Sequence, residues 1–112
     1  MPKRRDWTAA REKVDAEGQC RACGAGESSD VRLEAAHLWP RSMGGTQEPA
    51  GIVPLCSRLG PHGCHQLFDE HRLNLGHVLT TEEQAELVRQ SGSLASAMRR
   101  AYPLDYREER AA

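Results

Sequence analysis

The chain has 112 residues, of which 38% are hydrophobic, 28% charged and 4% aromatic, with a formal net charge of −1. This length fits one domain, and the balanced charge excludes a strongly basic protein that coats nucleic acid without specificity. A domain this small and polar needs stabilisation beyond its core, such as a metal or a disulfide. No apolar run of roughly 18 residues occurs, and none follows the charged N-terminus MPKRRDW. We therefore expect no membrane span, no signal peptide and a cytoplasmic location.

The first predicted element is a helix over residues 6–17, with Asp6 as its cap and Gly18 as its stop. Its apolar residues recur at helical spacing: Trp7, Ala10 and Val14. Two strands follow, over 31–38 and over 51–55. The first is separated from the second by a loop rich in Pro and Gly. A second loop is expected from Ser57 to Gly63.

The sequence after residue 63 predicts three helices: over 64–73, over 81–90, and from Ser93 to a stop at Pro103. The middle one is expected to begin with a capping box between Thr81 and Gln84. Residues 107–112 are expected to form a frayed tail.

The four cysteines form two pairs, Cys20 with Cys23 and Cys56 with Cys64. A Cys-x2-Cys turn presents two thiolates, and a second turn can complete a tetrahedral zinc shell. Thiols in a reducing cytoplasm bind metal more readily than they form disulfides. We therefore predict a structural zinc that ties the two loops together. The alternative is two disulfides, or structural thiols without a metal.

The histidines suggest a second centre. His37 ends the first predicted strand, and His65 and Asp69 are four residues apart on one face of a predicted helix, a face that Arg72 would share. Hydrolysis of a phosphodiester needs a base for water and a cation on the phosphate. An imidazole can be the base, and a histidine with a carboxylate can hold the cation. The alternative is a simple surface pair and a solvated strand-end histidine.

The order of these features resembles the HNH endonucleases, the ββα-metal nucleases, in a zinc-bound variant. The segments that carry the resemblance are CRACG, LEAAHLWPRSMGG, GIVPLC and GCHQLFDEH. The resemblance implies an α+β fold, with a small ββα-metal core held by a four-cysteine zinc and flanked by N- and C-terminal helices. It implies one domain over 1–112, with the core at 20–73 and a helical extension at 80–103. Within that extension, GSLASAMRRAYP resembles small phage-associated members.

The resemblance also implies roles for individual residues. His37 matches the general base, and His65 matches the metal-binding histidine. Asp69 lies where colicin-type DNases have a second helical ligand, and Gly44 and Gly45 match the loop between the strands. The four cysteines match the structural zinc ligands. The catalytic ion would be a divalent metal: magnesium, manganese, nickel or zinc.

Two positions depart from the family pattern. Ala36 stands where the family has a metal-binding His or Asp, and Gly51 stands near the Asn that commonly orients the catalytic imidazole. The chain's one Asn, Asn74, is far from this loop. Glu34 is expected on the opposite face of the strand from His37, so we do not expect it to replace the missing ligand.

The leading hypothesis is a metal-dependent DNA endonuclease that cuts or nicks duplex DNA. His37 would activate water, and Arg41, Arg58 and Arg72 are candidate phosphate contacts or, alternatively, solvated surface arginines. The competing hypothesis is a noncatalytic zinc-stabilised module, derived from the HNH fold, that binds nucleic acid or protein; the two departures favour it. A zinc-bound thiol enzyme is disfavoured because all four thiols are assigned to metal. A phage packaging machinery is a natural context for protein partners.

Overall fold

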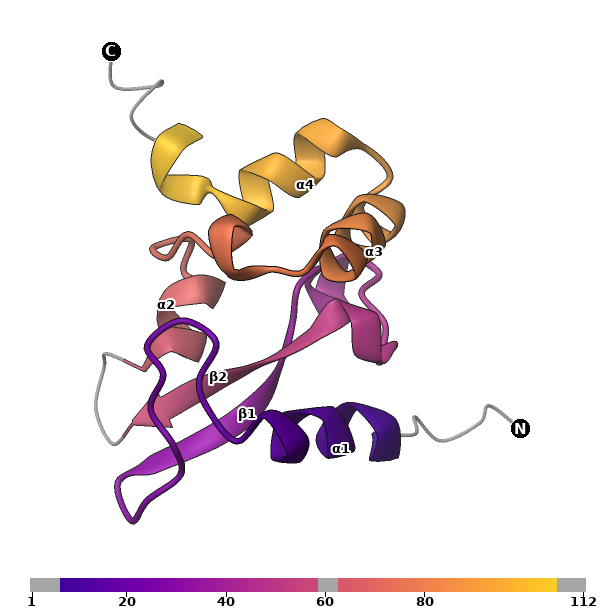
Figure 1. Cartoon of the computed structure of the whole chain (residues 1–112). Helices are drawn as coiled ribbons and strands as arrows, with labels where there is room; N and C mark the ends of the chain where they lie inside the picture. Colours follow the sequence, from indigo (N-terminus) through magenta and orange to yellow (C-terminus); the bar gives the residue numbers. More distant parts are fainter. Residues whose placement is uncertain (1–6, 59–62, 107–112) are drawn as a thin grey trace.

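The computed structural model describes residues 7–58 and 63–106, which form helices around a two-stranded antiparallel sheet (Figure 1). The helices are α1 (Thr8–Glu17), α2 (Cys64–Asp69), α3 (Thr81–Ser91) and α4 (Leu94–Ala101). The strands are β1 (Val31–His37) and β2 (Ile52–Arg58), and the short 3-10 helices are η1 (Arg41–Met43), η2 (Pro49–Gly51) and η3 (Gly76–Val78). The predicted α+β class is confirmed. In the described ranges, no helix combines the length and apolar character needed to cross a membrane.

The sheet is a β-hairpin whose two strands are connected by a long loop over residues 38–51. β1 and β2 pair from Val31 opposite Arg58 to His37 opposite Ile52. In the connecting loop, the Gly45 N–H donates to the Pro40 carbonyl at 2.9 Å, and a Cβ on Gly45 would lie 1.8 Å from the Trp39 carbonyl oxygen. Only glycine fits there, which explains the second glycine of the Gly-Gly pair.

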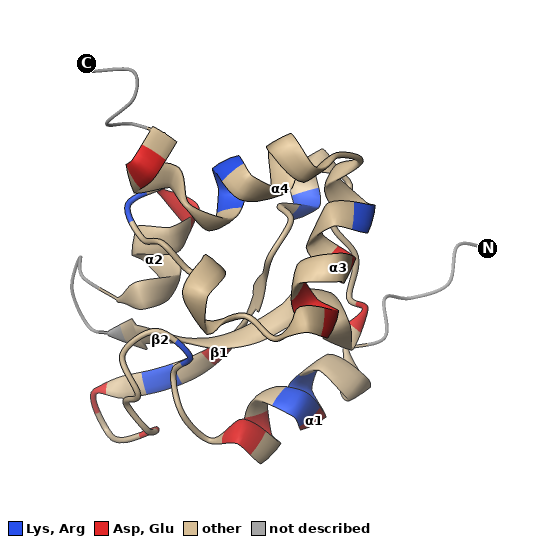
Figure 2. Cartoon of the chain, turned by 45° about the horizontal axis from the view of Figure 1, so that its top comes forward, with Lys and Arg blue, Asp and Glu red and all other residues tan. Residues whose placement is uncertain are grey.

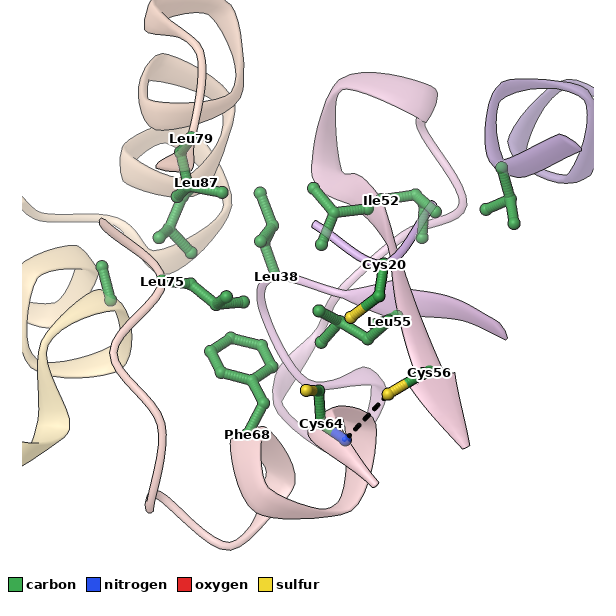
Figure 3. Close-up of a cluster of buried hydrophobic side chains, with 14 of the residues drawn as sticks. Cys20, Leu38, Ile52, Leu55, Cys56, Cys64, Phe68, Leu75, Leu79 and Leu87 are labelled. Atoms are coloured by element: carbon green, nitrogen blue, oxygen red, sulfur yellow. Dashed lines mark hydrogen bonds between the residues drawn. The ribbon is translucent and has the colours of Figure 1, made fainter. Parts of the chain in front are cut away.

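The helices surround the hairpin on several sides. α1 packs against both strands, α2 packs against β2, and α3 contacts both α4 and η2 (Figure 1). Charges of both signs lie on α1 and α3, whereas α4 carries only arginine among its charged residues (Figure 2). One cluster of buried side chains joins these elements (Figure 3). Its largest members include Phe68, Leu33, Leu38, Leu55 and Leu75.

The first helix follows the sequence closely. Ala10 and Val14 are fully buried, as the helical spacing predicted. Gly18 ends α1 in the left-handed region at φ 66°, and its N–H donates to the Val14 carbonyl. The predicted cap, Asp6, lies outside the described residues.

The predicted extent of α2 is wrong. The helix stops at Asp69 in a Schellman motif, in which the Arg72 N–H donates to the Leu67 carbonyl and the His71 N–H to the Phe68 carbonyl. His71 occupies the left-handed position, at φ 60°, where glycine is usual. Arg72 therefore does not continue the helical face of His65.

Two further boundaries differ from the prediction. β2 runs on to Arg58, because pairing with β1 keeps Ser57 and Arg58 in the strand; residues 59–62 of the predicted loop, like the tail 107–112, lie outside the described residues. The capping box of α3 is formed by Thr80 and Glu83 rather than by Thr81 and Gln84. Ser93 caps α4 as expected, and that helix ends two residues before Pro103.

Glu83 does more than cap α3. It is 2% exposed and accepts bonds from Lys13 Nζ of α1 at 2.7 Å and from Arg21 Nη1 at 2.6 Å. Burial opposes its ionisation, but the bonds from Arg21, Lys13 and the Thr80 backbone lower the pKa of Glu83 to about 2. Because Arg21 lies between Cys20 and Cys23, this carboxylate connects the first cysteine turn to α1 and α3.

Candidate metal centres

The four cysteines come together from three parts of the chain. Cys20 and Cys23 lie on the turn after α1, Cys56 lies in β2, and Cys64 begins α2. Their sulfur atoms all lie within 4.8 Å of one another, and no disulfide joins any of the four. Figure 3 shows Cys20, Cys56 and Cys64 among the side chains of the buried cluster.

The spacing of the sulfurs fits one metal ion. Cys23 Sγ lies 3.7 Å from Cys56 Sγ, well beyond the roughly 2.05 Å of a disulfide bond. Four thiolates placed about 2.3 Å from a tetrahedral zinc would be about 3.8 Å apart. The cluster therefore suits a structural metal site of the kind that zinc occupies.

The surroundings favour the thiolate form at some of the four sulfurs and oppose it at others. The Cys64 N–H donates to Cys56 Sγ at 3.5 Å. Burial opposes ionisation of Cys23, but the Ala25 N–H and the neighbouring thiols lower its pKa to about 7. Burial raises the pKa of Cys20, and burial together with the charge of Cys20 raises the pKa of Cys64. A metal ion favours the thiolate form of all four, so binding would release protons.

A second cluster of ionisable side chains lies beside the cysteines, where α2 packs against the sheet. The imidazole of His65 lies between two carboxylates. Its Nδ1 lies 2.8 Å from Glu34 Oε1 of β1. Its Nε2 lies 3.4 Å from Oδ2 of Asp69, which is one turn further along α2. These side chains line a cleft of about 420 Å³, together with Ser57, Gly63, Gln66 and Glu70. The predicted sharing of a face by His65 and Asp69 is confirmed.

The two sides of the imidazole have different chemistry. The contact of Nδ1 with Glu34 has hydrogen-bond length, and a carboxylate only accepts, so Nδ1 is the donor in this contact. In the neutral ring with that tautomer, the lone pair that a metal ion needs is on Nε2. The 3.4 Å between Nε2 and Asp69 Oδ2 is long for a hydrogen bond. Two ligand atoms roughly 2.1 Å from one ion would be about 3.0 Å apart in an octahedron and about 3.4 Å in a tetrahedron. Nε2 and Oδ2 thus have the spacing of two ligands of one cation.

Arg100 of α4 supports the other side of Asp69. Its Nη2 lies 3.4 Å from Asp69 Oδ1 and 3.3 Å from the His37 carbonyl oxygen. The end of β1 and the end of α2 therefore meet at one guanidinium. Sequence reasoning gave no role to Arg100.

His37, the predicted base, points its ring elsewhere. The ring packs edge-on against Trp7 with 5.2 Å between centroids, and His37 is not among the residues that line the cleft of His65. Glu34 lies three residues earlier on β1, so the alternation of the strand separates the two side chains, as expected. The structure brings the His37 backbone, but not its ring, beside Asp69.

The two candidate phosphate contacts whose side chains are described, Arg41 and Arg72, have different neighbours. Arg41 is exposed, with Cζ 5.7 Å from the centroid of the Trp7 ring. Arg72 is exposed and pairs with Glu70 at 3.4 Å. The side chain of Arg58 lies outside the described part of the chain.

Comparison of the chain with protein families, with curated proteins and with solved structures finds no match. The HNH resemblance therefore stands on the segments of the sequence alone.

Proposed function

We propose that the protein is a metal-dependent DNA endonuclease, with a structural zinc on the four cysteines and a divalent ion bound by His65 and Asp69. The observation that carries this proposal is the pair His65 Nε2 and Asp69 Oδ2, 3.4 Å apart in a cleft, with Glu34 behind the imidazole. The reaction itself comes from the resemblance to HNH endonucleases.

Three residues of the cleft, Glu34, His65 and Asp69, have proposed roles. Glu34 accepts a hydrogen bond from Nδ1 of His65, which fixes the ring orientation and directs Nε2 toward Asp69. Asp69 presents Oδ2 beside that nitrogen and supplies the negative charge of the site. A divalent ion bound there would stabilise charge on the scissile phosphate and on the leaving oxygen.

The proposed zinc positions this cleft. Cys64 is the residue before His65, and its partner Cys56 lies in β2. A metal on the cysteines would therefore hold the start of α2 against the sheet, and His65 with it. Metal binding at such a site contributes directly to the free energy of folding.

His37 remains the proposed general base, since it stands at the position of the family's catalytic histidine. A neutral imidazole is the side chain that most often takes a proton from water in general base catalysis. The packing of its ring against Trp7, together with Ala36 in place of a metal ligand, favours the second candidate: a noncatalytic zinc-stabilised module that binds nucleic acid or protein.

Nicking of supercoiled plasmid separates the two candidates. The wild type is incubated with magnesium, manganese, nickel or zinc, beside His37→Ala, His65→Ala and the control His77→Ala, which changes an exposed histidine outside the cleft. We expect His37→Ala to slow cleavage by about a hundred- to ten-thousand-fold. His65→Ala should lose cleavage through weakened metal binding, so excess metal should restore part of it.

Two results would decide against parts of this proposal. If the wild type cuts no DNA with any of the four metals, the endonuclease proposal is wrong and the noncatalytic zinc-stabilised module is favoured. A His37→Ala variant that cuts as fast as the wild type shows that another residue is the base.

A further inference from the structure

Arg100 is a buried cation that binds four groups at once. It comes from α4, and its side chain is 4% exposed. Its Nε donates to the Leu38 carbonyl at 2.7 Å, its Nη1 to the Phe68 carbonyl at 3.3 Å, and its Nη2 to both the His37 carbonyl and Asp69 Oδ1. The guanidinium carbon also lies 3.8 Å from the centroid of the Phe68 ring.

The planar shape of the guanidinium is what this arrangement uses. Two of its acceptors are the carbonyls of His37, the last residue of β1, and of Leu38, which follows it. The other two belong to the last turn of α2, where a cation also interacts favourably with the helix dipole. Burial lowers the pKa of Arg100, and the nearby carboxylate of Asp69 counteracts that effect. A lysine would keep the charge but could not reach all four acceptors from one point.

The carboxylate of Asp69 is largely exposed, at 58% of its side chain, and would otherwise rotate freely. Arg100 contacts Oδ1, while the second oxygen, Oδ2, faces His65 Nε2. At 3.4 Å the contact with Arg100 is also long for a hydrogen bond, so it acts mainly as an ion pair. Its attraction for Oδ1 favours the orientation in which Oδ2 of Asp69 faces His65.

We propose that Arg100 is a positioning residue for the divalent-metal site: it orients Asp69 toward His65 and fixes the end of β1 to the end of α2. The inference rests on the proposed function, because it concerns the same ion. It makes helix α4 part of the site, although the described residues that line the cleft belong to β1, β2, α2 and their flanks.

The test is a manganese titration of the full chain, already loaded with zinc, followed by electron paramagnetic resonance. Arg100→Lys keeps the positive charge but removes the planar guanidinium with its several N–H donors. Arg99→Lys is the control, because Arg99 is the preceding residue of the same helix and its side chain is exposed. We expect Arg100→Lys to raise the Kd for Mn²⁺ by about 10- to 100-fold, the usual effect of losing a residue that supports a metal ligand. Arg99→Lys should stay within about twofold of the wild type.

Affinity is counted per zinc-loaded molecule, because zinc content reports the folded fraction. A purely structural role for Arg100 would lower the melting temperature and leave this Kd unchanged, which would overturn the proposal. Arg100→Gln, which keeps two N–H donors without the charge, provides the same comparison if the lysine variant does not load zinc. A wild type that binds no Mn²⁺ beyond its zinc would overturn the metal site itself, and the role of Arg100 with it.

Discussion

Glu83 connects α1, the first cysteine turn and α3, so Glu83→Gln tests how the scaffold holds the metal centres. The pKa of this carboxyl falls from 4.5 to about 2, which at about 1.4 kcal/mol per unit corresponds to about 3 kcal/mol of stability. Lys13 and Arg21 stay 24% and 15% exposed, so water screens part of this interaction. We therefore expect Glu83→Gln to lower the free energy of unfolding by about 2 kcal/mol and the melting temperature by about 8–16 °C.

Urea unfolding of the zinc-loaded chain at pH 7 measures the effect. Glu82→Gln is the control, since Glu82 is exposed in the first turn of the same helix. A lowered carboxyl pKa stabilises the fold above its unfolded value near 4.5, and this contribution is lost as the pH falls toward about 2. Protonated cysteines release zinc, so the difference between wild type and Glu83→Gln is followed down to the lowest pH at which both chains keep zinc, and it should begin to shrink as the pH approaches 4.5. A difference below about 0.5 kcal/mol at pH 7 would refute the reasoning.

Four further substitutions are expected to have different effects on stability and metal binding. Cys23→Ser should lose zinc and unfold the chain, as seen by elemental analysis and circular dichroism, because a metal in a small core contributes several kcal/mol; stoichiometric zinc with an unchanged melting temperature would contradict this. Gly45→Ala should destabilise the fold by about 2 kcal/mol or more through its clash with the Trp39 carbonyl. Gly44→Ala, whose Cβ would meet nothing within 4 Å, should lose only about 1 kcal/mol through its positive φ. Glu34→Gln should weaken Mn²⁺ binding at least about tenfold in calorimetry, and an unchanged affinity would show that Glu34 does not support the histidine.

Local patterns in the sequence predicted the parts of the fold that depend on local chemistry. The apolar spacing of Ala10 and Val14 placed α1, and the glycine after it placed its end. The end of α2 was not predicted because the left-handed position after the helix is occupied by a histidine, His71. Glycine is the usual residue at this position, and its absence removed the signal for the helix end. The end of β2 was missed because strand pairing, a non-local interaction, extends it to Arg58.

In the candidate site, too, local spacing was predicted from the sequence and contacts between elements were not. Helical spacing predicted that His65 and Asp69 share a face, and the cysteine spacing predicted a cluster. Glu34 was correctly placed on the opposite face of β1 from His37, but its contact with His65 depends on how α2 packs against the sheet. Arg100 gave no signal, since its partners are mostly backbone carbonyls about 30 to 60 residues away in the chain. Spacing along one element is visible in a sequence, whereas contacts between elements are not.

The most direct test of the central claim is a crystal structure of the zinc-loaded chain grown with Mn²⁺, with anomalous maps that distinguish the two metals. The account predicts zinc among the four cysteine sulfurs and manganese between His65 Nε2 and Asp69 Oδ2, with Glu34 still bonded to Nδ1. Manganese absent from the His65 cleft at a concentration that supports cleavage would contradict it.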